Sequence, residues 1–505
     1  MHKLCETLIR FGIYAIIIVV PILYGGVTPG AKVFFAISVS LLFWTWFLVE
    51  MWLAQDLRLT FRKVFLNTGI EWIFLLSIAL CLIQVLPLYP GVLKIVSPHT
   101  HEIYQKAEAA IAISPSFEEQ DLFEGTAPDR KKIVLGKKRT ISLNPYQTFQ
   151  GLIHFTFLFL LYLLAVRFFR KLQNLEFLIK VLILLGIGQS IYGFTEYLSG
   201  HHYVVFDPMN NLRSVTGTFI NRNHFAGYLE MSFFCAIGLL IHRIKRLKLH
   251  RSHSWRHHIL TIFSDRNITL FFWLMCPIVI ACGIVFSKSR SGIIFTALGI
   301  LFFIFFHFLR KSSWKLAILF FCLIILSVYW TGTAGLSDRF DHMAQHYFAR
   351  QDFWVDTLHI FIHYPIAGTG MNTFDRVYPR HRLAYDNVDP VHAHNDYLEL
   401  LSEGGLIGLI LLVSLIFIIS RQVKRNLDEI PDIYLSLFTG SLAGLVTIAL
   451  HGLTDFNFQI MANQVNFIIL LAIITLFSSH SVRYRIRKRS TSKLKQVIDA
   501  GICLN

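Results

Sequence analysis

The sequence predicts an all-α membrane protein with about twelve transmembrane helices. Hydrophobic residues make up 54% of the 505 residues and charged residues only 15%, and the mean hydropathy is +0.54, which is typical of proteins that cross a membrane several times. The spans should be helical, because lipid offers no partner to unpaired backbone groups. A span needs about 20 mostly apolar residues, and twelve such segments are centred near Ile17, Leu42, Ile78, Phe159, Leu185, Phe233, Ile278, Leu301, Ile324, Leu412, Leu442 and Ile469.

The distribution of positive charge predicts how the chain sits in the membrane. The net charge of +16 does not indicate a nucleic-acid-binding protein, because Lys and Arg are spread over loops and form no folded basic domain. Most of these residues fall on one side of the membrane, and the positive-inside rule makes that side cytoplasmic. Both termini are then cytoplasmic, and the first apolar segment, which lacks a clear cleavage site, is expected to be a retained signal anchor. All seven cysteines fall in spans or cytoplasmic ends, so exported disulfides are not expected.

Two exported segments are too long to be turns and divide the chain. The resulting organisation is: residues 1–89, spans one to three; 90–150, an exported loop; 151–330, spans four to nine; 331–403, a large exported loop; 404–480, spans ten to twelve; and 481–505, a basic cytoplasmic tail. In the first loop, the runs around GKKR suggest a small hairpin. In the second, aromatic and aliphatic residues from Phe348 to Ile362 recur at three- and four-residue steps, which predicts an amphipathic helix that carries Arg350, ends at Pro365 and lies along the membrane interface.

Polar residues gather at the expected exported ends of the spans in four places, residues 212–227, 287–292, 392–403 and 451–464. Because all four lie at the same depth, a shared pocket is plausible. The other notable polar tract, residues 242–258, is basic and contains histidines. It is expected to be a cytoplasmic loop that touches anionic lipid, with metal binding as the alternative.

Histidines and arginines in these clusters are the candidates for chemistry. His392, His394 and Asp396 have a spacing that would suit a metal, but a histidine beside Asn395 and near Glu399 reads more naturally as an imidazole whose tautomer is fixed for general-base work; capping and anchoring of the tenth span is the structural alternative. Arg290, Arg213 and Arg222 suit a phosphate or pyrophosphate, or alternatively anchor lipid headgroups. Asn223 and His224 lie beside Arg222, and Asp455 is either pocket wall or helix cap.

Taken in order, these segments resemble the O-antigen ligase and O-antigen polymerase superfamily of bacterial polytopic membrane glycosyltransferases. The resemblance covers about residues 150–480 and is carried by TGTFINRNHFAG, SRSG, FWVDTLHIFIHYPIAGTGMNTF, HAHNDYLELLSEGGLIG and HGLTDFNFQIMANQ. It implies a type C glycosyltransferase fold in the bacterial inner membrane, with a periplasmic active site. It also implies transfer of a glycan from an undecaprenyl pyrophosphate carrier to an acceptor, without metal or cofactor.

The resemblance also assigns roles to residues. His394 matches the histidine proposed to activate the acceptor, with His392 as the substitute candidate, and Arg290 and Arg213 match arginines assigned to the donor pyrophosphate. Where the family commonly has Asn-Pro-Asn, this chain has Asn221, Arg222 and Asn223, which leaves the role of Arg222 open. The residues expected to bind substrate are Arg222, Asn223, His224, Arg350, His392, Asn395, Glu399 and Asp455. A neutral histidine base predicts an inverting transfer whose rate falls at acid pH.

Several functions remain open at this stage. An O-antigen ligase acting on a lipid A core hydroxyl is favoured over an O-antigen or exopolysaccharide polymerase and over a protein O-oligosaccharyltransferase, which would share the donor site and differ in the acceptor. A secondary transporter would need ionisable groups near the membrane midplane, whereas the polar clusters here lie at the exported rim. A purely structural or receptor protein would have no need of arginines and histidines at matched depth.

Overall fold

The computed structural model of the chain describes residues 2–54, 68–113, 139–203, 214–246, 268–309, 349–383, 390–427 and 429–478. These residues form helices joined by turns, with no strand among them and one isolated bridge between Leu88 and Arg139. The all-α membrane fold is therefore confirmed. Ten helices in these ranges are long and apolar enough to cross a membrane: α1 (His2–Ile22), α2 (Pro29–Ala54), α7 (Pro145–Phe168), α8 (Leu172–Ser199), α9 (Arg222–Arg246), α11 (Ile268–Phe286), α12 (Arg290–Ile304, extended by η4, Phe305–Leu309), α16 (Asp396–Leu427), α17 (Asp432–His451) and α18 (Met461–Ser478).

Ten of the twelve expected spans correspond to these helices. The third expected span is α4 (Ile70–Val85), which is apolar but only 16 residues long. The ninth, centred near Ile324, falls in residues 310–348 and lies outside the described part of the chain.

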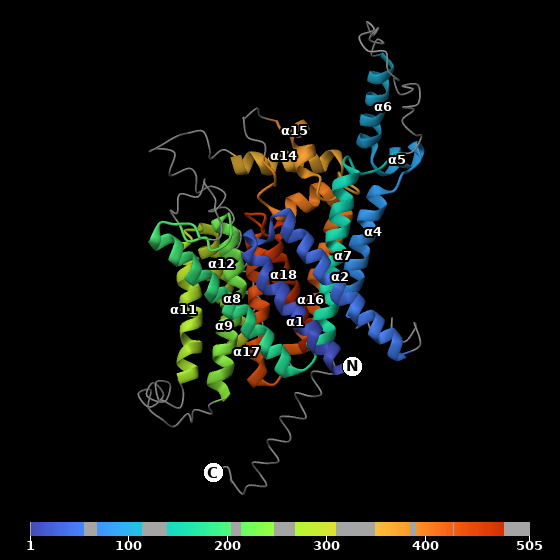
Figure 1. Cartoon of the computed structure of the whole chain (residues 1–505). Coiled ribbons are helices and arrows are strands. Elements are labelled where there is room, and N and C mark those ends of the chain that lie inside the picture. The colour runs from blue at the N-terminus through green and yellow to red at the C-terminus, as the bar shows by residue number, and fades with distance from the viewer. Residues whose placement is uncertain are drawn as a thin grey trace, which may run out of the picture.

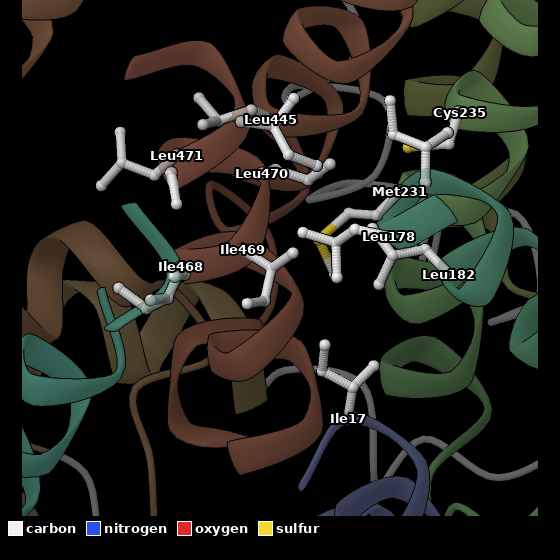
Figure 2. Close-up of a cluster of buried hydrophobic side chains, with 14 of the residues drawn as sticks. Ile17, Leu178, Leu182, Met231, Cys235, Leu445, Ile468, Ile469, Leu470 and Leu471 are labelled. Atoms are coloured by element: carbon white, nitrogen blue, oxygen red, sulfur yellow. The ribbon is translucent and has the colours of Figure 1, made fainter. Parts of the chain in front are cut away.

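Three helices form the centre of the bundle. In α9, α17 and α18 the most apolar windows are 83%, 78% and 89% buried, against 22% in α2 and 17% in α16. Figure 2 shows four consecutive residues of α18, Ile468–Leu471, among side chains of α1, α8, α9 and α17. Burial on all sides marks α18 as the core of the bundle, whereas α2 and α16 are placed to face lipid.

Glycines bring α9 and α17 into close backbone contact. A Cβ atom on Gly238 of α9 would lie 2.5 Å from the carbonyl oxygen of Ser436, and one on Gly440 of α17 would lie 2.5 Å from that of Phe234. Small residues at a helix crossing allow close van der Waals packing, the main attraction between helices in lipid. Helix α9 begins and helix α17 ends at one of the polar clusters. The close contact between the two helices therefore helps to set the distance between these two clusters.

A cap of shorter helices covers one end of the bundle. Figure 1 shows α14 (Ala349–His363) lying across the upper end, beside α15 (Phe374–His381). A helix is thus present before Pro365 as expected, with Phe353 and Ile360 buried. Ile362, which was expected on its apolar face, is exposed, and the position of the helix along the membrane interface stays a prediction.

Residues 90–150, expected to form a loop, are partly helical. Helices α5 (Pro90–Val96) and α6 (Pro98–Ile113) rise from the end of α4, and α7 already begins at Pro145. The expected hairpin falls mostly in residues 114–138, outside the described ranges. At its end, Arg139 pairs with Leu88 through two backbone hydrogen bonds.

Helix α16 begins eight residues before the expected start of the tenth span and breaks at Gly405. This glycine has φ 62° and ψ −157°, which separates a first segment in the cap from the membrane-spanning segment. Just before the break, the Glu403 carboxylate accepts hydrogen bonds from the backbone amides of Asn372 and Phe374, each 2.9 Å long. Helix α16 therefore belongs to both the cap and the bundle, and its two segments meet at Gly405.

Replacing Gly405 with alanine is expected to destabilise the protein. The positive φ alone costs a residue with a Cβ atom about 1–3 kcal/mol, and that atom would lie 2.4 Å from the carbonyl oxygen of Ile366. The neighbouring Gly404→Ala variant is the matched control, since its Cβ would meet nothing closer than 3.6 Å. Heating the detergent-solubilised variants and measuring the monomer that remains by size exclusion should show a clear loss only for Gly405→Ala; equal behaviour of both variants would contradict the assignment.

Candidate functional site

His394 lies at the junction of the cap and the bundle, two residues before α16. Its backbone has φ 50°, and its carbonyl oxygen accepts a hydrogen bond from the Trp354 indole N–H, 3.3 Å away. Its side chain is 26% exposed, and its Nδ1 atom is 3.3 Å from Oδ1 of Asp455. The ring is therefore held by a carboxylate on one side and open to an approaching molecule on the other.

Asp455 is the centre of this polar cluster. It is fully buried in the turn between α17 and η6 (Asn457–Gln459). Its Oδ2 accepts a hydrogen bond from the Asn223 side-chain amide and lies 3.6 Å from Nη2 of Arg350, and its Oδ1 is 3.6 Å from Nε2 of His224. Burial alone would raise the pKa of the Asp455 carboxyl, but hydrogen bonding with His224 and His394 and the charge of Arg350 hold the pKa well below its ordinary value. The group is thus an anion at neutral pH, able to hold a proton on Nδ1 of His394.

His392 forms a second histidine–carboxylate pair. Its Nδ1 is 2.8 Å from Oε1 of the buried Glu399. Glu399 also accepts hydrogen bonds from the Ala393 backbone amide, 2.8 Å, and from the Gln459 side chain, 3.0 Å. Glu399 therefore fixes the loop ahead of α16 as well as the His392 ring.

The ring of Phe456 packs against three imidazoles. Its centroid is 4.5 Å from that of His224, 4.6 Å from that of His392 and 4.7 Å from that of His394. An apolar ring among these side chains excludes water from their inner faces. Phe456 was not among the residues predicted for the site, although it follows Asp455 directly.

A chain of hydrogen bonds links His394 to the SRSG turn. Ser289 caps α12 by accepting a hydrogen bond from the Gly292 amide, 3.1 Å, and its hydroxyl donates to Oδ1 of Asn223, 2.8 Å. Asn223 in turn donates to Asp455. Arg290, which follows Ser289, is the first residue of α12 and is exposed. The structure thus brings all four sequence clusters, and Arg350 of α14, into one connected site.

The other expected site residues have varied positions. Arg222 is exposed at the first residue of α9, next to Asn223, whereas Arg213 lies outside the described residues. Asn395 caps α16: its side-chain oxygen accepts from the amides of Tyr397 and Leu398, and its Nδ2 donates to the Leu453 carbonyl. This geometry favours a supporting role for Asn395.

The histidines and the aspartate of HAHND do not share a partner. His392 faces Glu399 and His394 faces Asp455, while the Asp396 carboxylate accepts the backbone amide of Phe458 at 3.1 Å. The arrangement favours two oriented imidazoles at this position over a single ion held by all three residues.

A cavity of about 670 Å³ reaches the bundle side of the site. Its walls are mostly apolar and come from α2, α4, α7, α16, α17 and α18, with Lys32, His154, Asp396, Glu403 and Gln464 among the polar residues. Arg222, Arg290 and Arg350 do not line it. The cavity therefore suits a hydrocarbon chain rather than a phosphate.

The comparison with known families agrees with this arrangement. Among curated proteins, none matches the chain. The O-antigen ligase family model matches residues 272–413, a range that contains Arg290, Arg350, His392 and His394, whereas Asn223 and Asp455 lie outside it and join the site through contacts. Proteins of this family are glycosyltransferase-like enzymes that act on lipid-linked glycans. The match supports the resemblance seen in the sequence: residues 272–413 are similar to the O-antigen ligase family, within the O-antigen ligase and polymerase superfamily.

Proposed function

We propose that the protein is an O-antigen ligase that transfers a glycan from undecaprenyl pyrophosphate to a hydroxyl of the lipid A core, at the periplasmic face of the bacterial inner membrane. The observation that carries this proposal is the pairing of His394 with the buried Asp455, 3.3 Å apart, within a hydrogen-bonded path to the turn that holds Arg290. A base and a phosphate-binding cation in one site are what this transfer requires.

In the proposed reaction His394 is the general base. With a proton held on Nδ1 by Asp455, its Nε2 accepts the proton of the acceptor hydroxyl while that oxygen bonds to the anomeric carbon of the donor. The bond from this carbon to the phosphate oxygen breaks, and the pyrophosphate leaves with the electron pair. Attack from the opposite face inverts the anomeric centre. Arg290, with Arg222 and Arg213, stabilises the charge on the leaving group, an effect that accelerates transfer when it is stronger in the transition state.

The apolar cavity supports a lipid-linked substrate. It lies between helices of the bundle, and Asp396, one of its lining residues, is two residues from His394. A hydrocarbon chain seated there would hold the reacting group near the base, which converts the transfer into a reaction between prepositioned groups.

The charge at the two ends of α9 supports a periplasmic site. Arg222 and Asn223 begin the helix beside the site, and Arg243, Lys245 and Arg246 lie in its last turn, at the lower end in Figure 1. Positive charge concentrated at that end favours a cytoplasmic location for it, which supports a site on the opposite, periplasmic face.

The function is tested by deleting the gene and identifying glycan-bearing lipids by mass spectrometry. Loss of long glycan from the lipid A core, with intact polymer accumulating on the carrier lipid, is the expected result. Accumulation of single repeat units would instead indicate a polymerase, and loss of glycan from proteins alone would indicate a protein O-oligosaccharyltransferase. Complementation with the wild-type gene must restore the normal profile; an unchanged glycan profile after deletion would contradict all three transferase functions.

A further inference from the structure

Three histidines of the cap converge away from the transfer site. His359 and His363 lie on α14 and His381 ends α15, and one ring nitrogen from each lies within 4.8 Å of the others. We propose that these three imidazoles bind a transition-metal ion of the zinc class, which joins α14 to α15.

The backbone already orients two of the rings. Nδ1 of His359 lies 3.2 Å from the carbonyl oxygen of His381, and Nδ1 of His363 lies 2.8 Å from that of His359. A carbonyl only accepts, so each Nδ1 carries the proton and each Nε2 keeps the lone pair that a metal needs. Metal-binding histidines are commonly oriented in this way. The Tyr364 hydroxyl, 3.4 Å from Nε2 of His381, makes a long hydrogen bond that competes weakly with a metal.

A fourth histidine ring packs against this cluster. The centroid of the His363 ring lies 4.4 Å from that of His359 and 5.2 Å from that of His381, and His99 of α6 adds a fourth ring 4.7 Å from His363.

The donor set indicates the class of ion. Imidazole nitrogen suits zinc and its neighbours, whereas calcium and magnesium prefer oxygen ligands. The carboxylate of Glu102 is 3.6 Å from His99 and already pairs with Lys106 at 2.7 Å, and that of Asp356 accepts hydrogen bonds from the Tyr378 hydroxyl and the Leu383 amide. Ligands about 2.0–2.1 Å from a tetrahedral zinc ion lie about 3.3 Å apart, so the ring nitrogens would need to approach one another by at most about 1.5 Å. The fourth position is left for water or His99.

The position of the cluster indicates a structural ion. The same helix α14 that carries His359 and His363 also carries Trp354, which bonds to the carbonyl of His394. An ion that fixes α14 against α15 would hold this helix over the transfer site. This role is separate from the metal-free transfer itself, in which none of the three histidines takes part.

The site is tested by titrating zinc into the full-length protein in detergent, after removal of metal, in competition with a chromogenic chelator. The wild type is expected to bind one zinc ion per chain more than His363→Ala, with an affinity at that site at least about 100-fold above the residual binding. His363→Cys, which keeps a zinc ligand, should retain the ion. His101→Ala, which removes a histidine from α6 outside the cluster, is the matched control and should behave as the wild type.

Two further measurements distinguish loss of the site from a folding defect and from zinc binding elsewhere in the chain. The histidines of the basic tract, residues 242–258, are present in every variant. The quantity to compare is therefore the difference in bound zinc between variants. Cobalt bound to the wild type should show the visible spectrum of a tetrahedral site, absent in His363→Ala. Zinc should raise the melting temperature of the wild type, of His101→Ala and of His363→Cys, but not that of His363→Ala. Equal zinc binding by the wild type and a folded His363→Ala variant would overturn the proposal. This test measures zinc binding alone, so its outcome is independent of whether the protein is a ligase.

Discussion

Replacing His394 with alanine is expected to lower the rate of glycan transfer by about 10²–10⁴-fold, the usual contribution of a positioned general base. The measurement is the initial rate of transfer from a lipid-linked glycan to lipid A core by the purified protein in lipid nanodiscs. Because His394 has φ 50°, alanine adds backbone strain at this position. His394→Asn should therefore be measured as well, since asparagine tolerates this conformation and also lacks the base.

His392→Ala is the matched control for this loss. His392 also faces a carboxylate, Glu399 at 2.8 Å, and packs on the same Phe456 ring, yet its loss should lower the rate less than about 10-fold if His394 is the base. A large loss of transfer rate in His392→Ala, with the rate retained in His394→Ala, would show that His392 is the general base and His394 is not.

The rate of transfer should also fall as the pH is lowered from 7 to 5. Asp455, whose pKa is held well below its ordinary value, stays ionised over this range, so the fall reports a histidine. The stabilising contribution of Asp455 is present above the pKa of the unfolded chain, about 3.9, and is lost only as the pH falls through the depressed folded value. The melting temperature should therefore lose no contribution from Asp455 between pH 7 and 5, and a rate that is flat to pH 5 would contradict a histidine base.

Replacing Asp455 with asparagine is expected to lower kcat by at least about 100-fold, because the tautomer of His394 would be reversed. The amide nitrogen of asparagine donates a hydrogen bond to Nδ1, which moves the ring proton to Nε2, where the acceptor proton must go. Asp455 does not touch the reacting atoms in this scheme and is a positioning residue. A loss confined to kcat, with KM for the donor changed less than about fivefold, distinguishes positioning from donor binding.

Two variants separate this effect from a loss of structure. Glu399→Gln makes the same chemical change in the His392 pair and should reduce kcat by less than about 10-fold. Asp455→Glu restores the anion and should recover part of the rate lost in Asp455→Asn. If Asp455→Asn keeps nearly full kcat, the orientation of His394 does not depend on this carboxylate, and the proposed pairing of His394 with Asp455 as base and positioning residue is wrong.

Features set by neighbouring residues were predictable from the sequence. The spacing of apolar residues before Pro365 predicts α14, and the apolar segments predict the spans. The earlier start of α16 was missed, although Asn395, whose side chain caps the amides of Tyr397 and Leu398, carries a local signal for it.

Features that depend on packing were not predictable. Asp455 stands 61 residues from His394 in the chain, and nothing in TDFN says which histidine it meets. His381 reaches His359 and His363 only because α15 folds back on α14. One chain without aligned relatives offers no sign of either contact, so the partner of the base and the histidine cluster of the cap appear only in three dimensions.

The glycine contact between α9 and α17 bears on how the protein can move. With Gly238 and Gly440 within 2.5 Å of backbone oxygens once a Cβ is added, the two helices cannot slide or part without losing their contact, so they should move as one rigid body. Asn223 begins one of these helices and Asp455 follows the other, and their spacing should stay constant through a catalytic cycle. Any opening that admits the acceptor would then have to come from the cap, by displacement of α14 relative to the fixed pair of helices α9 and α17.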